Sequence, residues 1–252
     1  MSKSFGLGII LGIVLLIVAG VGASKLQDKD KKQYQAEVAD ATPIQLGVMT
    51  EKQEQHSKLY NQYNTRNKIP DLLKLNDDGI VMHFKLPTPV SYPGQVRSEA
   101  DEMKRITCAA DTIVLGTVKK SASQITEGQS FLFTDYVLLV QQVLKNNSRS
   151  LLQQEAEIMI TRPGGAVLID NKRVTAIDKS IPPLRRGKQY LLFLRYLPET
   201  DSFASIETGE SYELNRNTLQ LLRYRPEGVI SAKHNSISFV NEVKTAVGGP
   251  CN

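Results

Sequence analysis

Residues 131–144 read FLFTDYVLLVQQVL, and this stretch decides the fold class. It is rich in aromatic and β-branched residues, which favour extended strands. An ordinary strand has about 5–6 residues, so a strand this long is expected to bend through a β-bulge. The pattern agrees, because Phe131 and Phe133 share one face whereas residues 137–140 carry apolar side chains on both faces.

Shorter strands are expected on both sides of this stretch. The segments that show strand-forming patterns are residues 79–86, 112–120, 157–161, 166–169, 173–176, 189–196, 202–206, 212–214 and 218–222. Regularly spaced short strands with turn signals between them are typical of a sandwich or a small barrel. The sequence therefore predicts a mainly β domain, an OB-like small barrel or a sandwich, with short flanking helices.

The strand pattern also predicts two pairings and the position of one strand. Residues 166–176 are expected to form a hairpin around Asp170 and Asn171. Residues 202–206 and 212–214 are expected to pair around Gly209. Residues 189–196, QYLLFLRY, are the most apolar strand and are expected to be central.

Helices are expected to flank the strands. Residues 51–66 suggest a polar helix that Pro70 ends. Residues 98–106 follow a capping-box pattern and suggest a second helix. Residues 237–247 suggest a terminal helix, and residues 121–128 suggest a loop.

An uncharged apolar run, Phe5 to Ala23, precedes all of these segments. A helix of this length spans about 28 Å, close to the thickness of a bilayer core. We therefore expect a hydrophobic helix that meets a membrane. Two interpretations stay open, namely a signal peptide cleaved near Ala23, which leaves a secreted or periplasmic protein, and an uncleaved single-pass anchor. In both the remaining chain lies outside the cytoplasm, although the lysines that begin at Lys25 resist export and keep the inverted orientation as a third alternative.

The chain has two cysteines, Cys108 and Cys251. In an exported protein an even number of cysteines favours a disulfide. Cys251 lies in a terminal Gly/Pro segment that offers little packing, so we expect an intramolecular bond between the two. Free thiols and an intermolecular bridge are the alternatives.

Composition and charge pattern divide the chain into four parts. Residues 1–23 are the signal peptide or anchor, and residues 24–97 are a polar tether with a partial helix and one short strand. Residues 98–225 are the β domain, and residues 226–252 are a C-terminal helix with a tail that carries Cys251.

Five segments of the β domain form a recognisable set: ADTIVLGTV at 110–118, FTDY at 133–136, VQQVLKN at 140–146, PGG at 163–165 and GKQYLLFL at 187–194. Through these segments the domain resembles a netrin-like module, the OB-type barrel of tissue inhibitors of metalloproteinases and of uncharacterised bacterial exported proteins. The resemblance covers about residues 107–225.

The resemblance implies an inhibitor function. This sequence differs from those inhibitors in the position of its cysteine. Those inhibitors bind the zinc of a protease through a cysteine that is the first residue of the mature chain. Cys108 has a similar place before the strands, but residues 24–107 would still precede it after signal cleavage. Inhibition by that mechanism would therefore require a second cleavage.

Residues that could carry chemistry are scattered. His56, His83 and His234 show no metal-ligand spacing. Asp111, Asp135 and Asp178 interrupt apolar stretches, and of these Asp135 must either face solvent or find a partner. We assign no catalytic residue, no cofactor and no metal site.

The net charge of +5 comes from both signs mixed along the chain. A nucleic-acid surface normally clusters its Lys and Arg. The nearest cluster, residues 185–188 (RRGK), falls at an expected turn, so we expect no nucleic-acid partner.

These observations favour a non-enzymatic binding module of the cell envelope or of the secreted fraction. Its partners would be the membrane, through Phe5 to Ala23, and a protein of the envelope. An envelope hydrolase with an unrecognised site and a protein that acts like a protease inhibitor are the alternatives.

Overall fold

The structure is a computed structural model that describes residues 42–43, 48–61, 68–76, 78–84, 99–178, 181–206, 211–222 and 233–251. Over these residues the chain is mainly β with a few short helices, as the strand pattern predicts. The expected hydrophobic helix, Phe5 to Ala23, lies outside the described residues. Within them, no helix is both long enough and apolar enough to span a bilayer.

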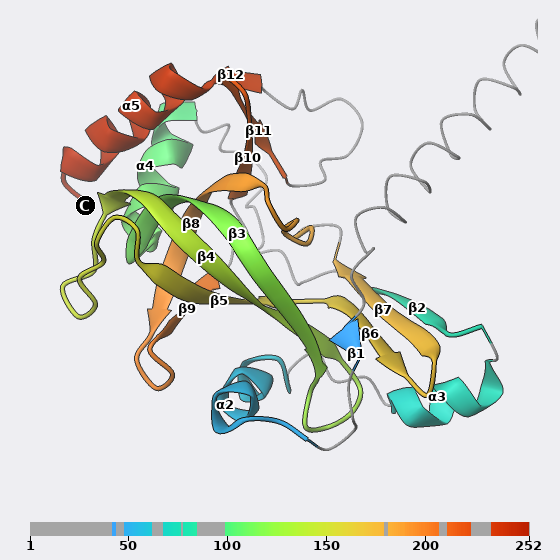
Figure 1. The fold of residues 1–252 in the computed structure, drawn as a ribbon. Coiled ribbons are helices and arrows are strands. Elements are labelled where there is room, and N and C mark those ends of the chain that lie inside the picture. Colours follow the sequence, from blue (N-terminus) through green and yellow to red (C-terminus); the bar gives the residue numbers. More distant parts are fainter. Residues whose placement is uncertain are drawn as a thin grey trace, which may run out of the picture. The chain divides into compact units, whose positions relative to one another are not determined.

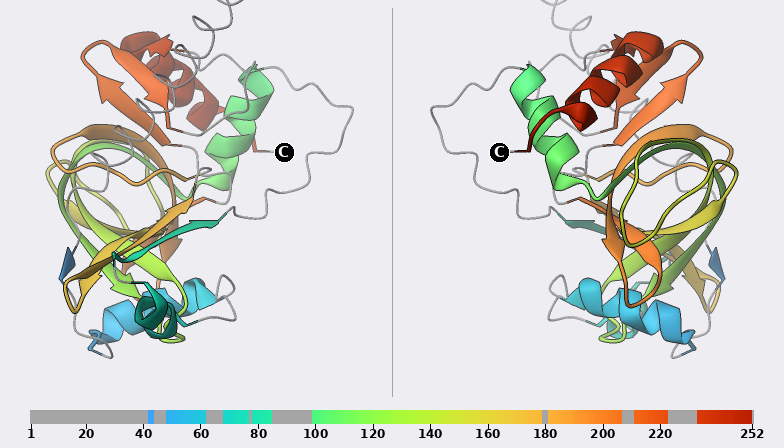
Figure 2. Two further views of the ribbon diagram at one scale, coloured as in Figure 1. Left: turned by 90° about the vertical axis from the view of Figure 1, so that its right-hand side faces the viewer. Right: turned by 90° about the vertical axis from the view of Figure 1, so that its left-hand side faces the viewer.

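Most of the strands belong to one 8-stranded sheet (Figure 1). Its members in sheet order are β12 (Lys233–Asn235), β11 (Thr218–Leu221), β10 (Ser211–Asn215), β8 (Gln189–Leu197), β3 (Thr112–Ile125), β4 (Leu132–Lys145), β5 (Glu157–Pro163) and β9 (Ser202–Ser205). An additional pairing joins β9 back to β8. The pairings β3–β4–β5–β9–β8–β3 therefore close on themselves, and these strands are called the strand circuit below (Figure 2).

Every strand of the circuit contributes to one apolar core. From β8, Tyr190, Leu192 and Leu194 enter this core. The alternate residues Leu191 and Phe193 enter a second cluster with the C-terminal helix. A strand that is buried on both faces carries a nearly continuous apolar run, and β8 pairs with β3, β9 and β10. The expected central position of this strand is confirmed.

The two longest strands of the circuit, β3 and β4, form one irregular antiparallel pair. Their register shifts at three places, the last between Val118 and Lys120. The β-bulge or irregularity expected of residues 131–144 is therefore present in this pair. At Gly116 the two strands approach closely, because a Cβ there would lie 2.6 Å from the carbonyl oxygen of Leu139.

A second, 4-stranded sheet contains β1 (Thr42–Pro43), β6 (Gly165–Ile169), β7 (Lys172–Asp178) and β2 (Ile80–Phe84), in that order. β6 and β7 form the expected hairpin, and Asp170 and Asn171 have φ values of 50° and 63°. These are the left-handed angles that a type I′ turn requires. The helix α3 (Ile69–Leu75) contributes Ile69 and Leu73 to the core of this sheet.

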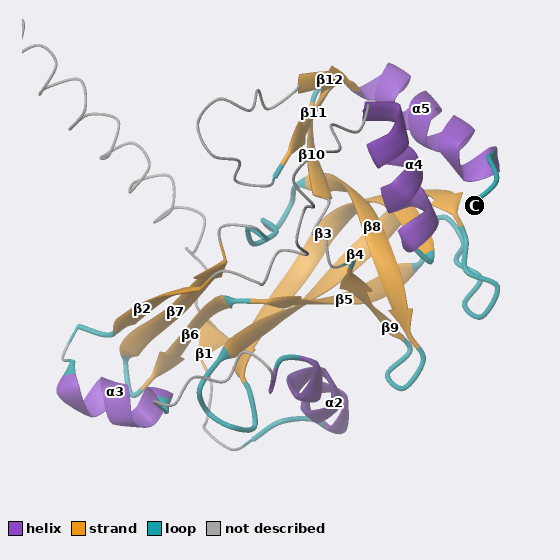
Figure 3. Cartoon of the chain, turned by 180° about the vertical axis from the view of Figure 1, so that it is seen from behind, coloured by secondary structure: helices purple, strands orange, loops and turns teal. Residues whose placement is uncertain are grey.

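Two helices cover the other end of the molecule, α4 (Glu99–Ala109) and α5 (Ser236–Gly248), which lie side by side (Figures 2 and 3). Phe239 and Val243 of α5 pack in the second cluster with Ile106 of α4. The expected terminal helix is confirmed. The expected helix over 98–106 is longer than predicted, because Lys145 Nζ of β4 donates hydrogen bonds to the Thr107 and Ala110 carbonyls at 2.9 and 2.6 Å.

Two helix and loop predictions are wrong. Pro70 does not end the helix over 51–66; α2 (Glu51–Leu59) stops earlier, and Pro70 lies in the first turn of α3. Proline is tolerated there because the first turn does not need its N–H. Residues 121–125 are not a loop but the end of β3, since they pair with residues 132–136 of β4.

The expected pairing of residues 202–206 with 212–214 is also wrong. β9 pairs with β5 and with residues 194–197 of β8, and β10 pairs with residues 189–192 of β8. The two strands occupy successive parts of β8. A local turn signal cannot distinguish this arrangement from a hairpin.

The segment expected to be a polar tether, residues 24–97, contributes to the fold wherever it is described. β1 pairs with β6, β2 pairs with β7, and α2 buries His56 and Ser57. The expected partial helix and short strand are present there, as α2 and β2.

Candidate functional site

The helix α2 starts at a capping box that sets which of its side chains face the strands. The N–H of Gln53 donates to Thr50 Oγ1 at 3.3 Å, and the N–H of Thr50 donates to Gln53 Oε1 at 2.9 Å. Two otherwise unsatisfied donors are thereby paired. One turn later His56 and Ser57 are buried, and Ser57 Oγ accepts the N–H of Glu127 at 2.7 Å.

Asp135 of β4 faces this helix. Its neighbour Tyr136 belongs to the core of the strand circuit. Because successive side chains of a strand point to opposite faces, Asp135 points outward, and it is 7% exposed. A buried carboxylate needs a partner, which His56 provides.

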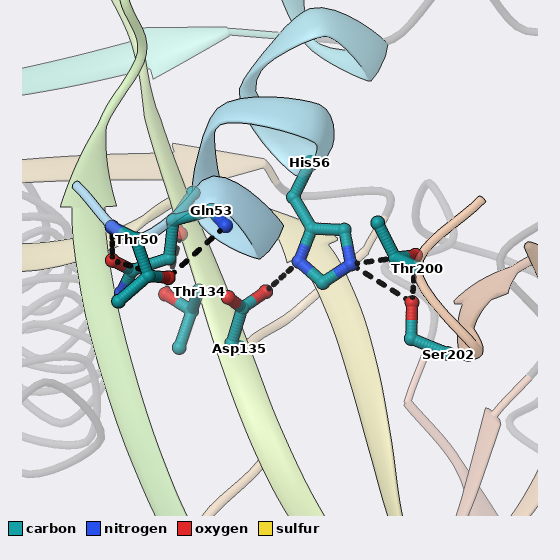
Figure 4. Close-up of polar contacts among 8 residues, drawn as sticks. Thr50, Gln53, His56, Thr134, Asp135, Thr200 and Ser202 are labelled. Carbon is teal, nitrogen blue, oxygen red and sulfur yellow. Dashed lines mark hydrogen bonds and ion pairs between the residues drawn. The ribbon is translucent and has the colours of Figure 1, made fainter.

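The imidazole of His56 lies between Asp135 and two hydroxyls (Figure 4). Its Nδ1 is 2.9 Å from Asp135 Oδ1. Its Nε2 is 2.8 Å from Ser202 Oγ and 3.2 Å from Thr200 Oγ1. Nδ1–H donates to the carboxylate, which accepts, and Nε2 is paired with the two hydroxyls. These four residues are called the His56 cluster below.

The Thr200 hydroxyl comes from the turn that joins β8 to β9, and the Ser202 hydroxyl comes from the first residue of β9. Asp201 lies between them with φ 46°, a left-handed conformation that is uncommon outside glycine. The hydroxyls of Thr200 and Ser202 are 2.6 Å apart. Asp201 Oδ1 accepts a hydrogen bond from the hydroxyl of Tyr196 at 2.9 Å, which ties the turn to β8.

The order of groups in the cluster, carboxylate then imidazole then hydroxyl, is that of a serine nucleophile with its base and orienting acid. The cluster differs from a catalytic triad in its access to solvent, because the exposed fraction of both His56 and Ser202 is 0%. The base His56 lies on α2, so a displacement of this helix would separate the base from Ser202. In this arrangement the cluster joins α2, β4, the β8–β9 turn and the start of β9.

The sequence singled out Asp135 but not its partners. The spacing of the three histidines indicates no site, but His56 is fully buried in α2 and belongs to the cluster. Thr200 and Ser202 carried no signal. The only clue was a carboxylate inside an apolar strand, which shows that a partner is needed without showing where that partner lies.

The other residues considered from the sequence are dispersed. His83 is exposed on β2, and His234 lies on β12 opposite Leu219. Asp111 Oδ2 accepts the N–H of Tyr196 at 2.9 Å. Asp178 is buried at the end of β7. None of these residues belongs to the His56 cluster.

The basic turn at residues 185–188 is partly neutralised by Glu213 of β10. Arg185 Nη2 lies 2.5 Å from Glu213 Oε2, and Lys188 Nζ lies 3.9 Å from Glu213 Oε1. Burial alone would lower the pKa of Arg185, but the hydrogen bond and charge of Glu213 raise it overall. The N–H of Arg185 also donates to the hydroxyl of Tyr190 at 2.8 Å, and burial raises the pKa of Tyr190 to about 12.

The two cysteines meet at the opposite end of the strand circuit from α2. Cys108 lies in the last turn of α4, and Cys251 follows α5. Their Sγ atoms are 2.05 Å apart, at bonding distance, and their Cα atoms are 5.6 Å apart across a separation of 143 residues. The expected pairing is therefore present, and it joins the two helices.

The described residues contain no group of three or more His, Cys, Asp or Glu side chains that is arranged to hold a metal ion. No protein-family model matches the sequence. A search of curated proteins also finds no match.

Proposed function

We propose that this protein is a non-enzymatic interaction module of the cell envelope, either anchored or secreted, whose strand circuit is an OB-type barrel. The observation that carries the proposal is the Cys108–Cys251 pair. Such bonds form and persist in oxidising compartments. Two distant cysteines held at bonding distance by α4 and α5 support a location outside the cytoplasm.

The closed set of pairings supports the barrel. Each strand of the circuit has a neighbour on both sides within it, and its inward side chains form one apolar core. Closure removes exposed strand edges, which are otherwise a route to aggregation. A closed barrel with an apolar core suits a rigid scaffold for contacts with a partner.

The burial of the His56 cluster supports a non-enzymatic module. A substrate from solvent cannot reach the Ser202 hydroxyl in this arrangement, because Ser202 and His56 are both fully buried. The cluster instead stabilises the packing of α2 on the strands.

The location is tested on the full chain isolated from cells that were quenched with acid and alkylated without reductant. Peptide mass analysis should recover the Cys108 and Cys251 peptides cross-linked to each other. N-terminal sequencing of the same sample should read from Ser24 after cleavage, or from Met1 or Ser2 in an anchored protein. Full alkylation of both cysteines would contradict the proposal. A Cys251→Ser variant is the control, because its Cys108 must become alkylated.

A hydrolase is the second candidate, because the His56 cluster connects a carboxylate, an imidazole and a hydroxyl by hydrogen bonds in the same order as a catalytic triad. A fluorophosphonate probe reacts with activated serines and tests this directly. We expect no labelling of the wild type beyond that of Ser202→Ala, with the exposed Ser238→Ala as the matched control. Labelling that only Ser202→Ala abolishes would establish the hydrolase and overturn the non-enzymatic proposal.

The inhibitor alternative is less consistent with the geometry. Cys108 lies inside α4, its sulfur is paired with Cys251, and its nitrogen belongs to the helix backbone. A cysteine in this state cannot act as the N-terminal zinc ligand of the resembling inhibitors.

A further inference from the structure

A buried arginine lies inside the strand circuit. Arg162 of β5 is 1% exposed and alternates with Ile158 and Ile160, both of which belong to the circuit core. None of its Nε, Nη1 and Nη2 atoms has a hydrogen-bond partner in the part of the chain that the structure describes.

This arrangement is unfavourable for the arginine as it stands. A guanidinium stays protonated in proteins and presents five N–H donors. Removing such a charge from water is compensated only by acceptors and opposite charge. Burial lowers the pKa of Arg162, while its interactions with Tyr136, Tyr190, Tyr60 and Asp178 oppose this shift.

The groups whose electrostatic interactions raise the pKa of Arg162 are mainly tyrosines. The Tyr190 hydroxyl accepts the N–H of Arg185, which leaves its own proton to donate. Asp178 is the only carboxylate among these groups and has the smallest effect of the four. Arg162 forms no ion pair with any described residue. No acceptor of the described residues is hydrogen-bonded to the guanidinium.

We propose that the strand circuit encloses a site for a small anion, of halide or carboxylate size, with Arg162 as its principal ligand and the hydroxyl of Tyr190 as a second donor. The anion supplies the hydrogen-bond acceptors that the guanidinium does not find among the described residues. The site lies in the interior of the circuit, apart from the His56 cluster on its outer face, and it does not depend on the proposed function.

Crystals of the full chain grown in bromide test the site directly. We expect an anomalous peak in hydrogen-bonding contact with the Arg162 guanidinium. Density for water alone at that position, or bromide bound at the protein surface as an adventitious ion only, would overturn the proposal. This test needs no variant and remains valid if substitutions at Arg162 prevent folding.

Thermal unfolding at constant ionic strength gives a second test. The wild type should gain about 5–10 °C in Tm when bromide or acetate reaches about a hundred times its dissociation constant. Arg162→Met should lose this saturable gain. Arg195→Met, which changes an exposed arginine of β8, should keep it. An equal gain in all three proteins would show that the anions act on the surface and not at Arg162.

Discussion

His56 Nδ1 lies 2.9 Å from Asp135 Oδ1, although 79 residues separate the two in the sequence. The contact joins α2 to the hairpin end of the β3–β4 pair, where Asp135 is opposite Ala122. Both side chains are buried, and His56 is the partner that pairs the Asp135 carboxylate. The hydroxyls of Thr200 and Ser202 complete the arrangement on the other side of the ring.

Removing His56 should destabilise the protein strongly. His56→Ala leaves the Asp135 carboxylate buried without its partner, and breaking a buried pair in this way costs about 3–5 kcal/mol. Urea unfolding measures the change. His83→Ala, which alters an exposed histidine of β2, should stay within about 0.5 kcal/mol of the wild type. Equal stability of the two variants would show that the pair does not hold α2 in place.

Loss of the cysteine pair should release the end of the molecule that carries α4 and α5. A Cys108→Ser/Cys251→Ser double variant should lose about 2–5 kcal/mol of unfolding free energy. Hydrogen exchange should show the loss of protection first in α5. Reductant should lower the stability of the wild type to that of the double variant and leave the variant unchanged. A wild type that is insensitive to reductant would contradict a stabilising bond.

Lys145→Met should shorten α4 at its C-terminal end. The variant loses the hydrogen bonds to the Thr107 and Ala110 carbonyls. Burial lowers the pKa of Lys145, which shows that its charge is partly desolvated, and this cost offsets part of the stability that the two hydrogen bonds provide. The expected loss of unfolding free energy is therefore about 1 kcal/mol. Amide exchange in the last turn of α4 reports the effect. Lys244→Met, on the exposed face of α5, serves as the control and should leave that turn unchanged.

Tyr190 should make the protein sensitive to alkaline pH. Burial raises its pKa to about 12 in the folded state from 10.0. Above pH 10 the unfolded chain loses this proton first, so folding stability is present below pH 10 and falls until about pH 12. The slope from this one group is about 1.4 kcal/mol per pH unit.

The matching variant is Tyr190→Phe. It should lose about 1 kcal/mol at neutral pH, because the N–H of Arg185 loses its acceptor. Its stability should fall less steeply than that of the wild type between pH 10 and 12. Parallel curves in urea unfolding across that range would exclude Tyr190 as the titrating group.

Much of the fold could be predicted because it depends on local patterns. Alternation and β-branched residues located β4 and β8, and the Asp170–Asn171 signal located a hairpin whose turn needs left-handed backbone angles. The partners of β9 and β10 could not be predicted. Both join β8, and the sequence near Gly209 is compatible with a hairpin as well.

Only one residue of the candidate site could be predicted from the sequence. Asp135 stood out as a carboxylate within an apolar strand, but nothing near it pointed to His56 or Ser202. The helix end at Ala109 was missed for a related reason, because the residue that satisfies its carbonyls, Lys145, belongs to another strand.

The sequence by itself determined the mainly β class, the positions of most strands and the pairing expected of Cys108 and Cys251. These follow from side-chain periodicity, backbone preference and the number of cysteines, all of which are properties of single segments or of composition. Only the tertiary structure decided that β9 closes the strand circuit, that His56 and Asp135 meet, and that Arg162 is buried without a hydrogen-bond partner among the described residues. Those contacts arise because packing brings together segments that are far apart in the chain, and burial then makes each unpaired polar group costly.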